Sequence, residues 1–401
     1  MPISPRLWAM LTVMVVAQAA TTVVTAAPAF LIPYLHEREG MSFAAAGMLA
    51  GAPNLGLVLS LVAWGAATDR FGERRVLLAG LGLTTFAVAA SLFTHGFLAL
   101  GLALVCSGAL SACTNSASGR LITGWFPAER RGFAMGIRQT CQPIGMAIAA
   151  IGVPPLAAAG GIPLALALGG MLTAVSLLLC AWIVRDPERH PARPAGSVPA
   201  AAPANPYRGS WVLARIHGVS MLLVIPQFAL STFGLVWFTV GFGWEPLAAG
   251  ALVATAQFAG AGGRILVGAW SDRVASRLRP LRIVAIAGVV VLLVAAALGW
   301  ADWGIPAAAA YLVATCVSVA DNGLAFTAVA EIAGPRWAGR ALGVQNTGQF
   351  LAAAAVGPVV GAAIGAVGIP AALALTALAP VLALPLIPSE RAAAAAAAPN
   401  G

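Results

Sequence analysis

The sequence predicts an all-α membrane protein, in which twelve transmembrane helices form two related six-helix bundles. Hydrophobic residues make up 60% of the 401-residue chain and charged residues only 9%, whereas a soluble domain carries roughly 25% charged residues to cover its surface. Apolar runs of membrane-helix length recur along the chain, and its second half repeats features of the first. Lipid is therefore the expected solvent for most of the protein.

Each apolar run is expected to be a helix. About 20 helical residues cross the hydrocarbon core, and backbone groups at that depth must be hydrogen-bonded within their own segment. The first run is too long for the apolar part of a cleaved signal peptide, which has about 7–15 residues. The predicted spans are, in order along the chain, 7–35, 43–66, 76–94, 97–125, 134–158, 163–184, 211–238, 247–270, 283–300, 305–331, 341–367 and 369–388.

One long hydrophilic segment divides the chain near its middle. Residues 185–210 are rich in proline, alanine and charge and have no apolar period, which is typical of a linker. The predicted domains are therefore an N-terminal six-helix bundle over 1–184 and a C-terminal one over 211–388. The alanine-rich end, residues 389–401, is expected to be disordered.

The net charge of +9 comes from arginine, since the sequence contains no lysine. A strongly basic soluble protein would suggest nucleic-acid binding. Here the arginines cluster in alternate short loops and in the linker, so we interpret them as determinants of membrane topology. The positive-inside rule then predicts that both termini and the linker face the cytoplasm, across a bacterial inner membrane. We expect a monomer in the lipid bilayer with no nucleic-acid partner.

The two halves repeat one another in the same orientation. Phe30–Arg70 aligns with Phe233–Arg273, and Gly136–Gln142 aligns with Gly343–Gln349. Chance similarity between alanine-rich helices is the alternative. Matched polar and glycine residues at two loops argue against it.

A charged motif stands between the second and third predicted spans. Its defining residues are Gly65, Asp69, Arg70, Gly72, Arg74 and Arg75, and a shorter copy after the eighth span has Gly268, Asp272 and Arg273. A small residue such as Gly65 allows two helices to approach closely in lipid. A carboxylate such as Asp69 can accept hydrogen bonds from the N-terminus of a helix in the other half. The arginines can bind carboxylates or lipid phosphates, or they can simply set the topology.

The pattern G-x-x-x-D-R-x-G-x-R-R resembles the loop signature of the major facilitator superfamily, and the resemblance extends over essentially the whole chain. It implies the major facilitator fold and secondary transport of a small molecule by alternating access. By the same resemblance, the motif latches the cytoplasmic side while the protein is open to the outside. It releases when the two halves rock.

Ionisable residues inside membrane helices are costly and usually functional. Arg264 on the eighth span is the sharpest candidate, because Gly263-Arg264 and the following Gly268 resemble helix eight of monocarboxylate and oxalate–formate carriers. In those carriers such an arginine binds the substrate carboxylate, and a guanidinium can contact two oxygens at once. Leu61 occupies the matching position of the first half. Nitrate carriers of the superfamily have arginine in both halves, so this difference argues against a nitrate-type site. A structural arginine, paired with Asp321 or with a helix end, is the alternative.

Further polar residues are candidates for contact with substrate. Arg120 resembles the arginine of a helix-four motif in proton-driven members of the superfamily. The other candidates, on helices four, five, ten and eleven, are Asn115, Arg138, Gln142, Asn322, Gln345 and Gln349. Interhelical hydrogen bonding is the more common role for such glutamines. Asp321, near the middle of the tenth span, is either a proton-coupling group or a fixed counter-ion.

The leading prediction is uptake or exchange of a small organic anion, such as a monocarboxylate, with coupling to protons or by exchange. Proton-antiport efflux of drugs or amphipathic metabolites is the alternative, because Gly357-Pro358-Val-Val-Gly361 partly resembles a drug-antiporter motif. Sugar transport is disfavoured by the few aromatic stacking platforms. The five cysteines and four histidines show no metal-ligand or nucleophile–base spacing, so neither an enzyme, a metal site nor a cofactor is expected.

Overall fold

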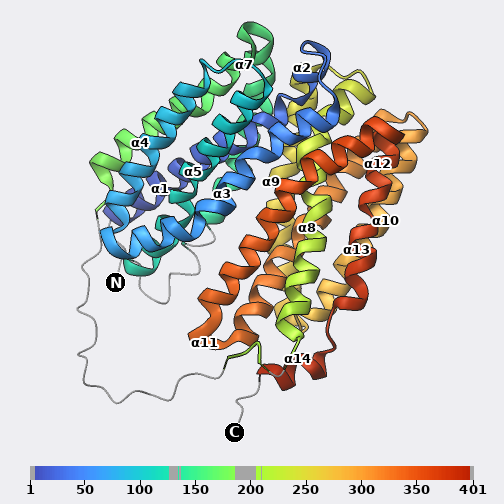
Figure 1. The fold of residues 1–401 in the computed structure, drawn as a ribbon. Helices are drawn as coiled ribbons and strands as arrows, with labels where there is room; N and C mark the ends of the chain where they lie inside the picture. Colours follow the sequence, from blue (N-terminus) through green and yellow to red (C-terminus); the bar gives the residue numbers. More distant parts are fainter. Residues whose placement is uncertain (1–4, 126–133, 135–136, 186–204, 209, 398–401) are drawn as a thin grey trace.

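The computed structural model describes residues 5–125, 134, 137–185, 205–208 and 210–397 (Figure 1). The described part of the first half consists of helices joined by short turns. Its helices are α1 (Pro5–Phe30), α2 (Ile32–Glu37), α3 (Phe43–Phe71), α4 (Glu73–Ser91), α5 (Phe97–Trp125) and α7 (Cys141–Ile183).

The second half has the same character. Its elements are α8 (Val212–Val236), the π-helical turn η1 (Trp237–Gly241), α9 (Pro246–Arg273), α10 (Leu278–Trp300), α11 (Gly304–Val367), α12 (Ile369–Thr376), α13 (Leu378–Ala383), the 3₁₀ turn η2 (Leu384–Leu386) and α14 (Glu390–Ala397).

The predicted twelve spans are confirmed. Eleven helices in the described chain are long and apolar enough to cross a membrane. One of them, Ile137–Ile183, has 47 residues, and at about 1.5 Å per residue it is long enough for two crossings. The backbone reverses inside it at Gly161, where φ is +69°. Gly334, with φ +70°, interrupts the 64-residue α11 in the same way between the tenth and eleventh spans.

Local sequence explains where the helices end. Ser42 begins α3, and its side chain accepts a hydrogen bond from the Ala45 backbone N–H. Gly72 ends α3 and begins α4 with φ +91°, a left-handed conformation that glycine adopts without steric cost. Glycine is therefore required at this motif position by the backbone itself.

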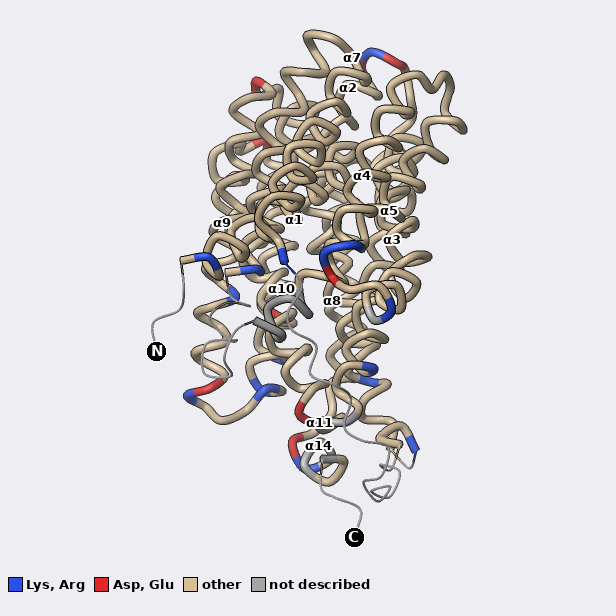
Figure 2. Tube along the Cα trace, turned by 90° about the vertical axis from the view of Figure 1, so that its left-hand side faces the viewer, with Lys and Arg blue, Asp and Glu red and all other residues tan. Residues whose placement is uncertain are grey.

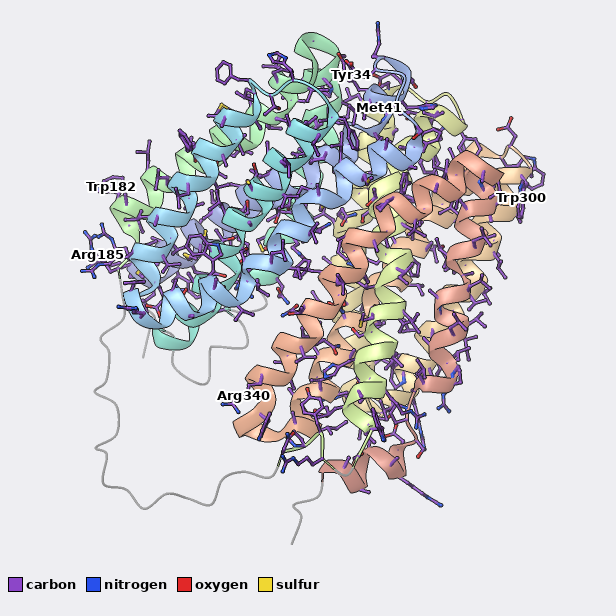
Figure 3. The ribbon with its side chains drawn as sticks, in the orientation of Figure 1. Tyr34, Met41, Trp182, Arg185, Trp300 and Arg340 are labelled. Carbon is purple, nitrogen blue, oxygen red and sulfur yellow. The ribbon has the colours of Figure 1, made fainter. Side chains whose placement is uncertain are left out.

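The helices form two groups that touch toward one end of the molecule and diverge toward the end that carries the termini (Figure 1). In Figure 2 most of the blue and red segments lie in the half of the molecule toward the terminal end, and few lie in the other half. Figure 3 shows Trp182 and Trp300 projecting outward from the helices. Their exposed fractions are 79% and 62%, which suits aromatic side chains at membrane interfaces.

Backbone-to-backbone contacts join the two groups where they touch. A methyl group added to Gly47 of α3 would collide with the Gly357 carbonyl of α11, and one added to Gly250 of α9 would collide with the Ala150 carbonyl of α7. These two contacts are related by the internal repeat, since Gly47 aligns with Gly250. Small residues at both crossings let the helix backbones meet directly.

The end of the chain differs from the prediction. Residues Glu390–Ala397, expected to be disordered, form helix α14. The Glu390 carboxylate accepts a hydrogen bond from Ser276, and Ser389 caps the helix through the Ala392 N–H. Alanine has the highest helix propensity of all residues, so an alanine-rich segment with a capping serine can form a helix despite its low complexity.

Candidate functional site

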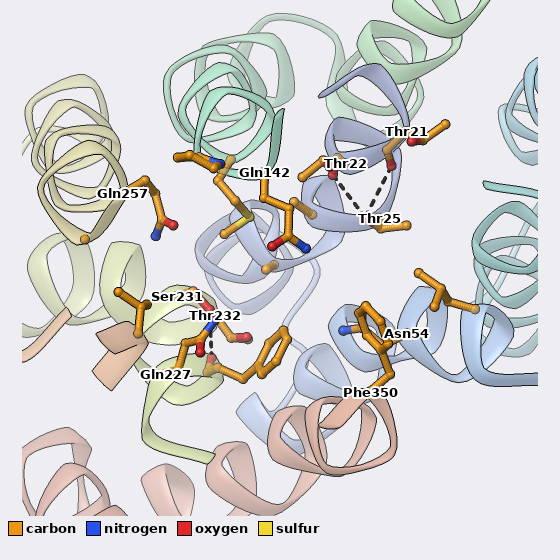
Figure 4. A pocket seen from close by; sticks show the side chains of 18 of the residues that line it. Thr21, Thr22, Thr25, Asn54, Gln142, Gln227, Ser231, Thr232, Gln257 and Phe350 are labelled. Carbon is orange, nitrogen blue, oxygen red and sulfur yellow. Dashed lines mark hydrogen bonds between the residues drawn. The ribbon is translucent and has the colours of Figure 1, made fainter. Parts of the chain in front are cut away.

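A cavity lies between the two groups of helices, and we call it the central cavity (Figure 4). Both halves contribute polar side chains to its wall. From the first half these are Gln18, Thr21, Thr22, Thr25, Asn54, Ser111, Asn115 and Gln142. From the second half they are Gln227, Ser231, Thr232, Gln257, Arg264 and Thr315. Among these described lining residues, Arg264 carries the only charge.

Arg264 has one firm hydrogen bond and a free end. Its Nε donates to the Val319 carbonyl of α11 at 3.2 Å. Neither terminal nitrogen has a partner among the described residues, so both remain available to a solute. The predicted structural alternative, an ion pair with Asp321, is not formed within 4.0 Å in this part of the chain, although the two charges attract one another. Arg264 is thus fixed by one hydrogen bond to the backbone, and its two terminal nitrogens can bind a solute.

Asp321 lies behind the cavity wall rather than on it. Asp321 is 1% exposed, and neither of its carboxylate oxygens has a hydrogen-bond partner among the residues that the structure describes. It faces a separate small compartment inside the second half, between Leu223, Pro226, Ser318 and Pro380. The volume of this compartment, about 10 Å³, is at the lower limit of roughly 10–15 Å³ for one water molecule.

Paired amides cross-link helices in both halves. Gln18 of α1 donates to Asn115 Oδ1 of α5 at 2.9 Å, and Asn322 of α11 donates to Gln227 Oε1 of α8 at 2.8 Å. Asn115 aligns with Asn322 in the internal repeat. The two bonds therefore join equivalent helices, and they fit the structural role that such amides commonly have.

Arg138 and the two glutamines of α11 are held inside their own halves. Arg138 donates from Nε to Ser118 Oγ at 2.7 Å and from a terminal nitrogen to the Asn115 carbonyl at 3.3 Å. Gln349 donates to Ser220 and to Asn322, both at 2.7 Å. Neither residue belongs to the described cavity lining. Both instead connect neighbouring helices of one bundle.

Gln345 takes part in a separate buried cluster. Its Oε1 lies 2.6 Å from His217 Nδ1, and His217 Nε2 lies 3.0 Å from the hydroxyl of Tyr207. Tyr207 also makes an edge contact with Trp337. This cluster ties the segment before α8 to α11. The sequence predicted only Gln345 of these four residues, because Tyr207 and His217 lie about 130 residues from Trp337 and Gln345 in the chain.

Gln142 of α7, which was predicted to contact the substrate, does line the central cavity. Asn54 and Gln257, which are repeat counterparts on α3 and α9, line it as well. None of these three amides is hydrogen-bonded to another described residue. The side chain of Arg120 lies outside the described residues.

The motif residues lie at the terminal end, where the halves diverge. Arg74 donates to the Ala181 carbonyl of its own half at 2.8 Å, and Arg70 stacks on the Phe71 ring at 5.3 Å. Arg75 and Arg273 are exposed. The side chain of Asp69 lies outside the described residues. These contacts of Arg70 and Arg74 stay within the first half.

The second motif copy is paired within its own half. Arg277 donates to Asp272 at 2.5 Å and to Glu331 at 3.1 Å. The hydrogen bond with Asp272, and then that with Glu331, raises the pKa of the Arg277 guanidinium above its ordinary value. This cluster joins the end of α9 to α11.

The expected close helix approach at Gly65 is absent. No described atom lies within 4 Å of the place where a Cβ at Gly65 or at Gly268 would stand. The close approaches are made at the opposite end of the cavity, by Gly47, Gly250 and Gly357. The motif lies at the end where the two groups of helices diverge (Figure 1).

Residues 9–358 match the Major Facilitator Superfamily. The chain belongs to this superfamily. It is 42% identical over 386 residues to an uncharacterized MFS-type transporter of Mycobacterium tuberculosis, Rv2994, and the alignment covers 95% of this chain and 84% of that protein. The protein is therefore a multi-pass secondary transporter that binds a small-molecule substrate, and it is not an enzyme.

Solved structures share the fold of this transporter at low sequence identity. A bacterial homologue of the human lysosomal transporter Spinster, in an inward-facing and unoccupied conformation, superimposes with a TM-score of 0.80 at 15% identity, covering 96% of this chain and 97% of that one. A D-xylose–proton symporter gives 0.76 at 15% identity, covering 96% and 99%.

Proposed function

We propose that this transporter moves a small organic anion and that Arg264 binds the carboxylate of that anion. The observation that carries the proposal is the free guanidinium fork of Arg264 on a cavity wall whose other described lining residues are uncharged. An isolated cation in a cavity within the membrane is costly unless an anion or water satisfies it. A bidentate contact with a carboxylate meets that need.

The resemblance of this segment to helix eight of monocarboxylate and oxalate–formate carriers supports the same conclusion. Arg264 lies on α9, which is the eighth span. Its repeat counterpart is Leu61, so the anion site belongs to the second half alone. The transport cycle would carry the anion between the two sides while it remains bound to that half.

Asp321 is our candidate for the coupling group. Its carboxylate has no fixed hydrogen-bond partner, and Arg264 is the charge that acts on it. A change in its proton would therefore alter the field at Arg264, and thus the hold on the anion, across the cavity wall. Exchange of one anion for another without proton movement is the other mode of operation.

Efflux of amphipathic drugs receives less support. The glycines of Gly357-Pro358-Val-Val-Gly361 suggested it, but both have a packing role. Gly357 meets Gly47, and Gly361 meets the backbone of Phe43.

Membrane orientation remains part of the proposal. With the termini in the cytoplasm, as the arginines predict, the diverging end faces inward.

The test compares anion binding and uptake by the wild type with Arg264→Ala. Thermal-shift measurements with a panel of carboxylates identify anions that stabilise the purified transporter. Proteoliposome uptake of the best one then measures transport. We expect Arg264→Ala to weaken binding about 10- to 100-fold, because a hydrogen bond to a charged group contributes about 1.5–3 kcal/mol.

Arg279→Ala is the matched control, since it removes the same charge from an exposed site outside the cavity. It should bind and transport as the wild type does. The proposal fails if no carboxylate stabilises the protein, or if Arg264→Ala responds to carboxylates as Arg279→Ala does.

A further inference from the structure

The amide side chains of the central cavity fall into two groups. Gln18, Asn115 and Gln227 are hydrogen-bonded to amide side chains on neighbouring helices. Asn54, Gln142 and Gln257 have no partner among the described residues, and we call these three the free amides. Figure 4 shows them entering the same space from three sides of the cavity. The first group connects neighbouring helices, whereas the free amides are available to hydrogen-bond a substrate.

From this division we infer that the substrate is a monoanion whose other end carries hydroxyl or oxo groups, and that the free amides select it. The inference rests on the proposed function, because it assumes that Arg264 binds a carboxylate. It adds the chemistry of the remainder of the molecule. A hydroxy or oxo monocarboxylate fits, whereas an alkyl monocarboxylate, a dicarboxylate or an amino acid does not.

The charges of the cavity decide the net charge of the substrate. Arg264 is the single cation of the described lining, and that lining contains no aspartate or glutamate. A second carboxylate would be desolvated without a counter-charge, and so would the ammonium group of an amino acid. A substrate with a net charge of −1 therefore balances the single positive charge of the described cavity lining.

The free amides decide the polarity of the uncharged end. Each amide offers two donor hydrogens and two acceptor lone pairs. Water satisfies them while the cavity is open. An alkyl chain would displace that water and leave them unpaired, at a cost of about 1–3 kcal/mol for each group. Hydroxyl groups can replace the lost hydrogen bonds, because they both donate and accept.

The spacing of the groups decides the length of the substrate. Gln257 and Arg264 are seven residues apart on α9, or about 10 Å along the helix axis, and they share one face because two turns take about 7 residues. Asn54, the repeat counterpart of Gln257, comes from α3 in the opposite half. A carboxylate at Arg264 therefore leaves the other end of a short-chain acid beside the free amides.

The experiment measures binding to the purified full-length transporter with chain-length-matched pairs. The pairs are gluconate with hexanoate and erythronate with butyrate, and glucarate serves as the dianion. We expect at least one hydroxylated acid to bind ten times or more tightly than its alkyl partner, and tighter than glucarate. An alkyl acid that binds as well as its partner, or a dianion that binds best, would overturn the inference.

Two variants test which residues make the selection. Asn54→Leu and Gln257→Met keep the approximate size of the side chain and remove its hydrogen-bonding groups. Both should lose preference for the hydroxylated acid and bind the alkyl acid more tightly than the wild type does, because no amide is then left unpaired. Thr255→Val is the control, because Thr255 is exposed on α9 and does not line the cavity. Preference retained in both amide variants would contradict the assignment.

The outcomes separate this inference from the proposed function. If alkyl and hydroxylated acids bind equally and Arg264→Ala abolishes both, the anion site stands and the selectivity assignment falls. If no carboxylate binds to the wild type, both fall together.

Discussion

Arg264 and Arg138, two arginines predicted as substrate ligands, occupy different environments. Arg264 lines the central cavity with its terminal nitrogens free, whereas Arg138 donates to Ser118 and to the Asn115 carbonyl inside its own bundle. Their residue type and their position in apolar runs are alike. The difference comes from which neighbours stand within hydrogen-bond distance, and the hydroxyl of Ser118 is 20 residues from Arg138 in the chain.

Asp321 gives the prediction that belongs to this scale. Asp321→Asn preserves the shape of the side chain and removes its exchangeable charge. If Asp321 is the coupling group, accumulation of anion driven by a pH gradient should disappear in proteoliposomes. Exchange of labelled for unlabelled anion should persist, because Arg264 and the free amides are intact.

Ser318→Ala, which alters the same compartment without a titratable group, should keep gradient-driven accumulation. The coupling role is wrong if Asp321→Asn still accumulates anion in response to the gradient. Asp321 would then be a counter-ion only.

At the level of elements, the sequence showed which glycines repeat between the halves, but it did not show which of them lie where helices cross. Gly65 was expected at a close helix crossing and, like Gly268, has open space around it, whereas Gly47, Gly250 and Gly357 lie at the crossings. The repeat aligns Gly47 with Gly250 from sequence alone. The contacts of α3 with α11 and of α7 with α9 depend on how the two halves dock, which the alignment of the repeat does not specify.

Gly357→Leu should weaken the closed end of the cavity, because its side chain would collide with the Gly47 carbonyl. Overpacking typically costs about 1–3 kcal/mol. The equilibrium should move toward the conformation that is open at that end. Spin labels at Glu39 and Asp302, in opposite halves, should report a larger separation.

Gly365→Leu on the same helix is the control, since a Cβ there meets no described atom within 4 Å. It should leave the label separation unchanged. Equal separations in Gly357→Leu and the wild type would show that this crossing does not hold the end closed.

On the scale of the whole molecule, the two halves touch at one end and diverge at the other (Figure 1). The motif with Asp69 and its copy with Asp272 sit at the diverging end, where Arg277 and Arg74 make their described contacts within one half. The superfamily resemblance assigns the latch between the halves to the state that is open to the outside, and this stays a prediction.

Topology can be tested with single cysteines and a membrane-impermeant maleimide, with the cysteine-containing wild type as background. His95→Cys lies in the loop between α4 and α5, and Ser389→Cys lies next to α14 at the terminal end. If the termini are cytoplasmic, intact cells should label the first variant and only permeabilised cells the second. The reverse pattern would invert the orientation, and the diverging end would then face outward.

The sequence by itself determined the membrane class, the helix spans, the internal repeat and the superfamily. These depend on local composition and spacing, because lipid forces apolar segments into helices wherever they occur. Only the tertiary structure decided which polar residues face the central cavity. It left Asn54, Gln142, Gln257 and Arg264 open to the cavity and enclosed Arg138, Gln345, Gln349 and Asp321 within the bundles. The physical reason is that helix rotation and the docking of two halves depend on contacts between residues far apart in the chain.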